Sequence, residues 1–300
     1  MARAISLVED GAPELAALSE ALYPHTGRTY TVGVTGSPGV GKSSLAAQLV
    51  RVARSRQRTV AVLAIDPTSP FSGGALLGDR VRMQAHATDP GVFIRSMATR
   101  GHLGGMALAA PEAVRVLDAS GKDLVFVETV GVGQAEVEVA TATDTTVVVV
   151  AAGWGDAIQA AKAGILEIAD VFAVNKADKE GAPDAIRDLK QMLHMGAARD
   201  WNPPVIATST VDGSGVDDLY DAIEGHRRHQ EGSGQLHERR RQRVVEEVES
   251  MVAFRLREQV AGLLSAGGDQ VDPLVVALSE RRLDPYRATE ILVARMSGPQ

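Results

Sequence analysis

Residues 36–43 read Gly36-Ser37-Pro38-Gly39-Val40-Gly41-Lys42-Ser43 and fit the pattern G-x-x-x-x-G-K-[ST] of a phosphate-binding loop. A short apolar stretch that is typical of a strand precedes this loop, and apolar residues at helical spacing follow it from Ser44 to Val52. A strand, a glycine-rich turn and a helix N-terminus together direct backbone N–H groups and the helix dipole at an anion. We therefore predict that residues 36–44 bind nucleotide phosphates, with Lys42 on the outer phosphates and the Ser43 hydroxyl on Mg²⁺.

Composition narrows the class of protein. The 300 residues are 45% hydrophobic and 23% charged, which is ordinary for a globular protein with about two domains. A net charge of −7 argues against a protein that binds nucleic acid through phosphate contacts. The absence of cysteine excludes a disulfide framework and a thiolate metal site. The longest apolar run, Val147–Gly153, is too short to span a membrane, and the N-terminal residues lack the apolar core of a secretory signal. We expect a cytoplasmic protein.

Short apolar runs alternate with helical patterns from Thr31 onward, which predicts an α/β fold with a mostly parallel sheet covered by helices on both faces. Ligands of such sheets bind beyond the carboxyl ends of the strands. The predicted strands are Thr31–Thr35, Thr59–Ile65, Val92–Ser96, Leu124–Glu128, Thr145–Ala151, Val171–Val174 and Pro204–Thr208.

We predict three parts: an N-terminal helical segment over residues 1–28, a nucleotide-binding domain over 29–228 and a C-terminal helical region over 229–300. The first part holds one or two short helices interrupted at Gly11. Residues 226–234 are polar and are interpreted as a linker.

The C-terminal region contains signals for three helices. Apolar residues recur at every fourth position from Val244 to Leu264, which predicts one long amphipathic helix. Asp272-Pro273 and Asp284-Pro285 each predict a helix start, with an N-cap acid before a first-turn proline. The basic run 239–243 is followed at once by glutamates, so we interpret it as a solvated helix face rather than a nucleic-acid patch.

Asn175-Lys176-Ala177-Asp178 closes a predicted strand and fits the guanine-reading pattern N-K-x-D. The Asp178 carboxylate can accept from guanine N1–H and the 2-amino group together, whereas adenine offers neither donor there. Asn175 can donate to the base edge, and the Lys176 stem can lie over the ring. After the last strand, Thr208, Ser209 and Thr210 are placed to close over the base with backbone N–H groups.

Acidic residues that follow two other strands are candidate metal ligands. Glu128 ends a strand that runs into a glycine-rich turn, where an acid can hold the Mg²⁺ shell through water and Gly131 can offer its N–H to the γ-phosphate. Asp66 follows the second strand and Asp79 lies further along the same connection. Oxygen ligands of this kind suit Mg²⁺, which keeps several waters.

At this point the chain resembles the MeaB/MMAA (ArgK-type) GTPases, which are relatives of the metal-insertion GTPases. The resemblance rests on the phosphate-binding loop and on four further motifs in the same order: Asp66-Pro67-Thr68-Ser69-Pro70, Gly78-Asp79-Arg80-Val81-Arg82-Met83, Glu128-Thr129-Val130-Gly131-Val132-Gly133-Gln134 and Asn175-Lys176-Ala177-Asp178. It implies a GTPase chaperone of adenosylcobalamin-dependent acyl-CoA mutases, chiefly methylmalonyl-CoA mutase, that gates cofactor delivery and protects the mutase from inactivation. It also implies a homodimer formed by the C-terminal helices.

The resemblance further implies that residues 155–162 form a loop that reports the nucleotide state to the mutase. Asp156, Gln159 and Lys162 are three residues apart in this stretch and would share one helix face. Lys162 is therefore included among the candidate nucleotide-site residues.

The predicted chemistry is hydrolysis of GTP to GDP and phosphate. Lys42 and Mg²⁺ would neutralise charge on the β- and γ-phosphates while water attacks in line. Glu128 would act through the metal shell. Gln134 is the candidate for positioning the water, although it does not occupy the usual place of a switch glutamine.

Two alternatives remain open from the sequence. A nickel- or cobalt-insertion GTPase would share much of the motif set but needs a metal-handing site, and this chain has no cysteine and no tight group among its seven histidines. A nucleotide-dependent kinase is the second alternative. The predicted selection of guanine by Asp178 argues against a kinase that uses ATP.

Overall fold

The computed structural model describes residues 1–67, 86, 88–99, 106–129, 135–151, 167–195, 200–265 and 272–297. The chain divides into two compact units, Met1–Val244 and Val245–Gln300. The division falls inside helix α11 (Gln235–Ser265), so the two units are described separately.

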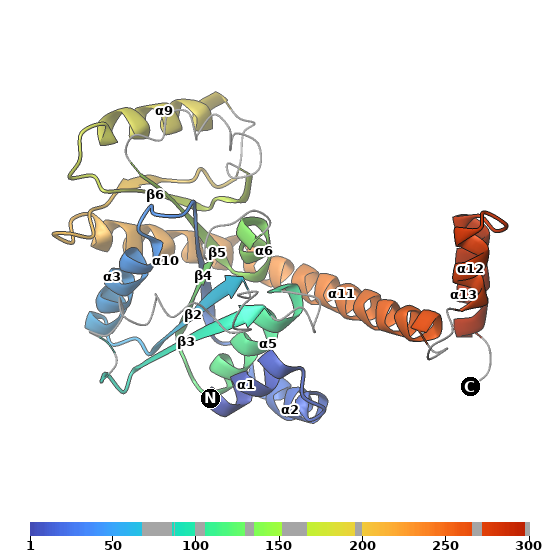
Figure 1. Ribbon diagram of the computed structural model, residues 1–300. Helices are drawn as coiled ribbons and strands as arrows, with labels where there is room; N and C mark the ends of the chain where they lie inside the picture. The colour runs from blue at the N-terminus through green and yellow to red at the C-terminus, as the bar shows by residue number, and fades with distance from the viewer. Residues whose placement is uncertain are drawn as a thin grey trace. The chain divides into compact units, whose positions relative to one another are not determined.

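A sheet forms the centre of the first unit (Figure 1). It has seven strands, in the order β3-β2-β4-β1-β5-β6-β7. Each pairing between neighbouring strands is parallel, so the predicted fold class is confirmed. Each predicted strand is found at its place, and no end is shifted by more than three residues. The strands are β1 (Tyr30–Thr35), β2 (Val60–Pro67), β3 (Val92–Thr99), β4 (Leu124–Thr129), β5 (Thr145–Ala151), β6 (Val171–Asn175) and β7 (Val205–Ala207).

Helices cover both faces of the sheet. On one face lie α3 (Lys42–Ser55) and α10 (Val216–Ser233); on the other lie α5 (Met106–Ala119), α6 (Ala135–Ala142) and α9 (Ala182–Met195). Strand β5 illustrates why central strands are apolar throughout. Val147 and Val149 belong to the core beneath α3 and α10, whereas Val148 and Val150 pack with Leu189 of α9.

The N-terminal residues form α1 (Ala2–Asp10), α2 (Leu15–Leu22) and the short 3-10 helix η1 (Tyr23–His25). Gly11 ends α1 with a φ of 57°, a left-handed conformation that glycine adopts without strain. Ile5 and Val8 are fully buried in the core that contains α5. Of the one or two short helices predicted around Gly11, the structure has two.

The linker predicted for residues 226–234 is wrong, because this stretch is the end of helix α10 and only Gly234 lies beyond it. His226 and Gln230 are one helical turn apart and both are fully buried. His226 Nδ1 and the Gln230 amide bond to partners on other elements, which composition along the chain cannot reveal. His226 Nε2 lies 3.3 Å from Asp170 Oδ1 and forms no hydrogen bond with the described residues.

The second unit contains the remainder of α11, with α12 (Pro273–Ser279) and α13 (Pro285–Ser297). Asp272 accepts a 2.7 Å hydrogen bond from the Leu274 N–H, and Asp284 accepts one of 3.0 Å from the Tyr286 N–H, so both predicted N-caps are confirmed. None of the described helices is long and apolar enough to cross a membrane.

Candidate functional site

The phosphate-binding loop lies between β1 and α3, and its glycines are required by close approaches. Gly36 has a φ of 137°, and a Cβ built there would lie 2.1 Å from the Val149 carbonyl oxygen. Gly41 has a φ of 97°, and its Cβ would lie 2.4 Å from Asn175 Nδ2. No larger residue fits either position, so the sequence pattern reflects the packing of this loop against β5 and β6.

Lys42 is the first residue of α3 and is 6% exposed. Its ammonium lies inside the loop and donates to the carbonyl oxygens of Gly36 at 2.6 Å and Ser37 at 3.0 Å. These two hydrogen bonds hold the positive charge of Lys42 at the N-terminus of α3. This placement suits the role predicted for Lys42 toward the outer phosphates of a nucleotide.

Ser43 and Glu128 meet at the same end of the sheet. The Ser43 hydroxyl donates to Glu128 Oε1 at 2.5 Å, and the two residues are 5% and 2% exposed. Register brings them together, because Glu128 pairs with Val34 of β1 just before the loop begins. A hydroxyl and a carboxylate in contact form an oxygen donor set that suits Mg²⁺.

The other predicted metal and switch residues are placed only in part. Asp66 lies in β2, which pairs with β4 through Ile65 and Thr129, so its backbone is at the same carboxyl edge as Glu128. Asp79, Gly131, Gln134 and Lys162 lie outside the residues that the structure describes.

The segment predicted to read guanine is bonded directly to the phosphate-binding loop. Asn175 is fully buried and its Nδ2 donates to the Val40 carbonyl oxygen at 2.7 Å, while Lys176 Nζ donates to the Gly39 carbonyl oxygen at 2.8 Å. The Asp178 carboxylate is exposed and forms no hydrogen bond or ion pair with the residues described. It is therefore accessible to a base that lies next to the loop.

The turn after β7 completes this edge. The N–H of Thr208 donates to Val174 O at 2.8 Å, and that of Ser209 donates to Ser214 O at 3.0 Å. Thr210 is the one of the three whose N–H has no partner among the described residues. Of the three amides predicted to close over the base, the Thr210 N–H is thus the one without a partner in the described part of the chain.

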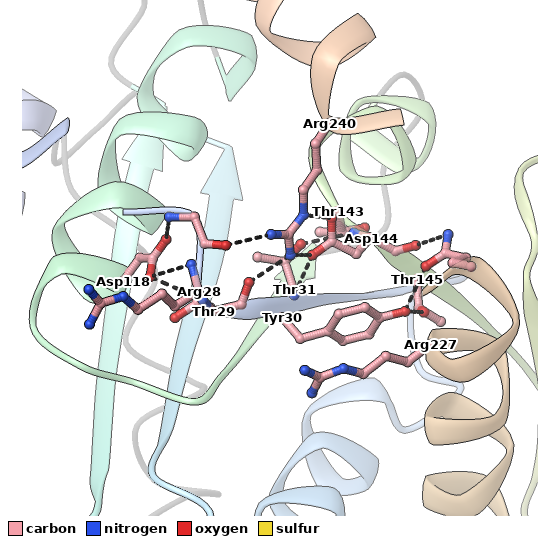
Figure 2. Close-up of polar contacts among 12 residues, drawn as sticks. Arg28, Thr29, Tyr30, Thr31, Asp118, Thr143, Asp144, Thr145, Arg227 and Arg240 are labelled. Carbon is pink, nitrogen blue, oxygen red and sulfur yellow. Dashed lines mark hydrogen bonds and ion pairs between the residues drawn. The ribbon is translucent and has the colours of Figure 1, made fainter. Parts of the chain in front are cut away.

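Sequence reasoning missed a buried polar network at the opposite, amino-terminal edge of the sheet (Figure 2). Asp144 is fully buried and accepts from the Thr31 N–H at 3.0 Å, from Arg240 Nη2 at 2.6 Å and from Arg243 Nη1 at 3.2 Å. Burial by itself would raise the pKa of Asp144, but the Arg240 hydrogen bond and the charges of Arg243 and Arg240 lower it. The basic run is therefore not a solvated face, and that interpretation is wrong for Arg240 and Arg243.

A second chain of polar contacts continues from this network into α10. The Tyr30 hydroxyl is 2.6 Å from Thr145 Oγ1 and donates to Gln230 Oε1 at 2.9 Å, and Thr145 Oγ1 is 2.8 Å from His226 Nδ1. Burial lowers the pKa of His226 to about 4, so its imidazole is neutral near pH 7. These contacts fix α10 and the start of α11 against the strands that carry the phosphate-binding loop.

Comparison with known proteins shows the family of this chain. The family model described as "Methylmalonyl Co-A mutase-associated GTPase MeaB" matches residues 1–264. A protein of Pyrococcus abyssi is 46% identical over 301 residues, covering 99% of this chain and 92% of its own. GTPase ArgK of Escherichia coli is 38% identical over 82% of this chain and 77% of its own. The mitochondrial methylmalonic aciduria type A homolog of Caenorhabditis elegans is 36% identical over 74% of this chain and 61% of its own.

Solved structures give the same fold. The crystal structure of a LAO/AO transport system kinase aligns over 99% of this chain and 92% of its own, with a TM-score of 0.71 and 29% identity. HypB from Helicobacter pylori, solved with nickel, covers 72% of this chain and 94% of its own with a TM-score of 0.52, but at 18% identity this likeness concerns the fold alone. The chain belongs to the MeaB family and is a P-loop GTPase.

Proposed function

We propose that this member of the MeaB family uses Mg²⁺-dependent GTP hydrolysis to gate the loading of adenosylcobalamin into an acyl-CoA mutase of the methylmalonyl-CoA mutase type, and to protect that mutase. The family description names a mutase-associated GTPase, which supports the partner class. The Asn175–Val40 hydrogen bond carries the nucleotide part of the proposal, because it joins the guanine-reading strand to the phosphate-binding loop. We place this function in the cytoplasm.

Each part of the site has a role in the proposed hydrolysis. Lys42 would hold the β- and γ-phosphate oxygens by charge. Ser43 would bind Mg²⁺, Glu128 would hold the metal's shell through water, and Asp66 and Asp79 would supply further oxygens. The metal would neutralise charge that develops on the transferred phosphoryl group. Gln134 remains the candidate for orienting the attacking water.

Base selection would follow from Asp178. An exposed carboxylate that forms no hydrogen bond or ion pair in the described part of the chain would accept from both guanine donors when GTP or GDP binds. Adenine would leave the same carboxylate covered and unpaired, at the cost of its desolvation. Lys176, held on the Gly39 carbonyl, would lie along the base.

We also propose that the protein acts as a homodimer, formed through its C-terminal helices. In the second unit, α11 exposes Val248 by 53%, Val252 by 50% and Leu256 by 45%. Apolar side chains at this spacing form one stripe, and a contiguous exposed apolar stripe is typical of an interface. A second copy of the same helix offers the matching surface, as the family resemblance implies.

Complex formation tests the mutase proposal directly. The purified protein is mixed with an adenosylcobalamin-dependent methylmalonyl-CoA mutase and run on size exclusion, with GDP and with a non-hydrolysable GTP analogue. The proposal predicts co-elution whose extent differs between the two nucleotides. Separate elution under both conditions would remove its support.

A further inference from the structure

A cavity of about 380 Å³ opens in the first unit, at the amino-terminal edge of the sheet. Three of its walls are the residues that lead into central strands: Arg28 before β1, Arg58 before β2 and Lys122 before β4. Arg227 of α10 forms a further wall. Because the strands are parallel, this cavity lies at the edge opposite the phosphate-binding loop.

Positive charge dominates the cavity although the whole chain carries a net charge of −7. Its lining contains three arginines and one lysine but only two carboxylates, Asp118 and Asp123. Both carboxylates accept hydrogen bonds from other residues of the protein. Asp118 accepts from the N–H groups of Gly27 at 2.6 Å and Thr29 at 3.0 Å, and Asp123 accepts from the Thr59 N–H and hydroxyl, each at 2.7 Å.

Two of the four cations of the cavity already have partners: Arg227 donates to Glu231 Oε1 at 2.8 Å, and Lys122 Nζ donates to the Gly91 carbonyl oxygen at 3.2 Å. The guanidinium groups of Arg28 and Arg58 are exposed and form no hydrogen bond or ion pair with the described residues. Figure 2 shows Arg28 beside Asp118 and Arg227 along the Tyr30 ring, whose centroid lies 4.9 Å from the Arg227 guanidinium carbon. Lys122 is 8% exposed, and burial lowers its pKa, a cost that a bound anion would offset.

We propose that this cavity binds a small phosphorylated ligand that carries at least two negative charges. Guanidinium groups match phosphate oxygens with two parallel N–H donors, and Arg28 and Arg58, which precede β1 and β2, offer two such forks to the same cavity. The volume is in the range of small-ligand sites, from about 300 to 1,000 Å³. This site is separate from the GTP site, and it does not depend on the mutase.

The test titrates inorganic pyrophosphate into the full-length Lys42→Ala protein, so that the phosphate-binding loop contributes as little as possible to binding. The same titration is repeated after adding Arg28→Ala and Arg58→Ala together. The matched control adds Arg187→Ala and Arg241→Ala, which remove two arginines with side-chain exposures of 69% and 62% from the surface of the same unit. Thermal melting of each variant checks the fold.

We expect the Arg28/Arg58 substitutions to weaken pyrophosphate binding by about tenfold or more, since each removes a charge-assisted contact, and the control to change it less than about twofold. Arg28→Lys with Arg58→Lys keeps the charge without the fork and should give an intermediate affinity. Unchanged affinity in the Arg28/Arg58 variant, or an equal loss in the control, would overturn the proposal. Citrate binding as tight as pyrophosphate would overturn its phosphate specificity.

Discussion

The Ser43 hydroxyl donates a 2.5 Å hydrogen bond to Oε1 of Glu128. This contact joins the first turn of α3 to the end of β4 and buries both side chains. The two residues are 85 positions apart in sequence, so only the parallel pairing of β1 with β4 brings them together.

We predict that Glu128→Gln lowers the rate of GTP hydrolysis by about 10- to 100-fold and raises the Mg²⁺ concentration needed for half-maximal rate, as expected for an outer-shell metal partner. Phosphate release measured against Mg²⁺ concentration checks this. Glu180→Gln, at an exposed position after β6, is the control and should leave the curve unchanged. A wild-type Mg²⁺ dependence in folded Glu128→Gln would contradict the assignment.

Asp178→Asn is expected to lower GTP affinity by about a hundredfold while leaving the weak binding of ATP unchanged, because the variant loses the acceptor for two guanine donors. Isothermal titration with GTP, GDP and ATP measures both effects. Asp184→Asn, at an exposed acid in the first turn of α9, serves as the control. Equal affinities of the wild type for GTP and ATP would refute the base-reading role.

Much of this fold was predictable because its signals are local. The apolar runs of β5 and β6 are buried on both faces, and the loop at residues 36–43 carries its own glycine pattern. The roles expected of Asn175 and Asp178 were predictable from a four-residue motif. What the sequence could reveal of the site was the identity of the residues that follow each strand.

The rest depended on contacts between distant residues. His226 and Arg240 are polar residues in polar stretches, and nothing near them in sequence marks them as partners of Thr145 and Asp144. Buried polar pairs carry no periodic signal in the sequence. The sequence therefore predicted a linker and a solvated helix face in two stretches where the structure has a buried polar network. One weak signal existed: Asp144 immediately precedes a strand that is apolar from Val147 to Ala151.

We predict that Arg240→Ala lowers the free energy of unfolding by about 3 kcal/mol, because it leaves the buried Asp144 with Arg243 as its remaining arginine partner. Urea unfolding at pH 7 gives the value. Arg241→Ala is a matched control one residue away, since Arg241 pairs with Glu238 at the surface and should be nearly neutral. Equal effects of the two substitutions would mean that the Asp144 contact does not anchor α11.

For the dimer, we predict that Val248→Glu with Val252→Glu shifts the protein from dimer to monomer in sedimentation velocity, because buried carboxylates would face each other across the helix stripe. Arg257→Glu makes the same total change in charge on the opposite side of α11 and should leave the dimer intact. A dimer that survives the valine substitutions at micromolar concentration would place the interface elsewhere.

The proposed coupling to a mutase is tested most directly by phosphate release from GTP with and without an adenosylcobalamin-dependent methylmalonyl-CoA mutase at saturating concentration. The account predicts a slow intrinsic rate that the mutase raises, by as much as about a thousandfold if it supplies a group that activates hydrolysis. Lys162→Ala should reduce this stimulation, because Lys162 belongs to the stretch that is proposed to report the nucleotide state to the mutase. A rate of GTP hydrolysis that is the same with and without the mutase would contradict the central claim.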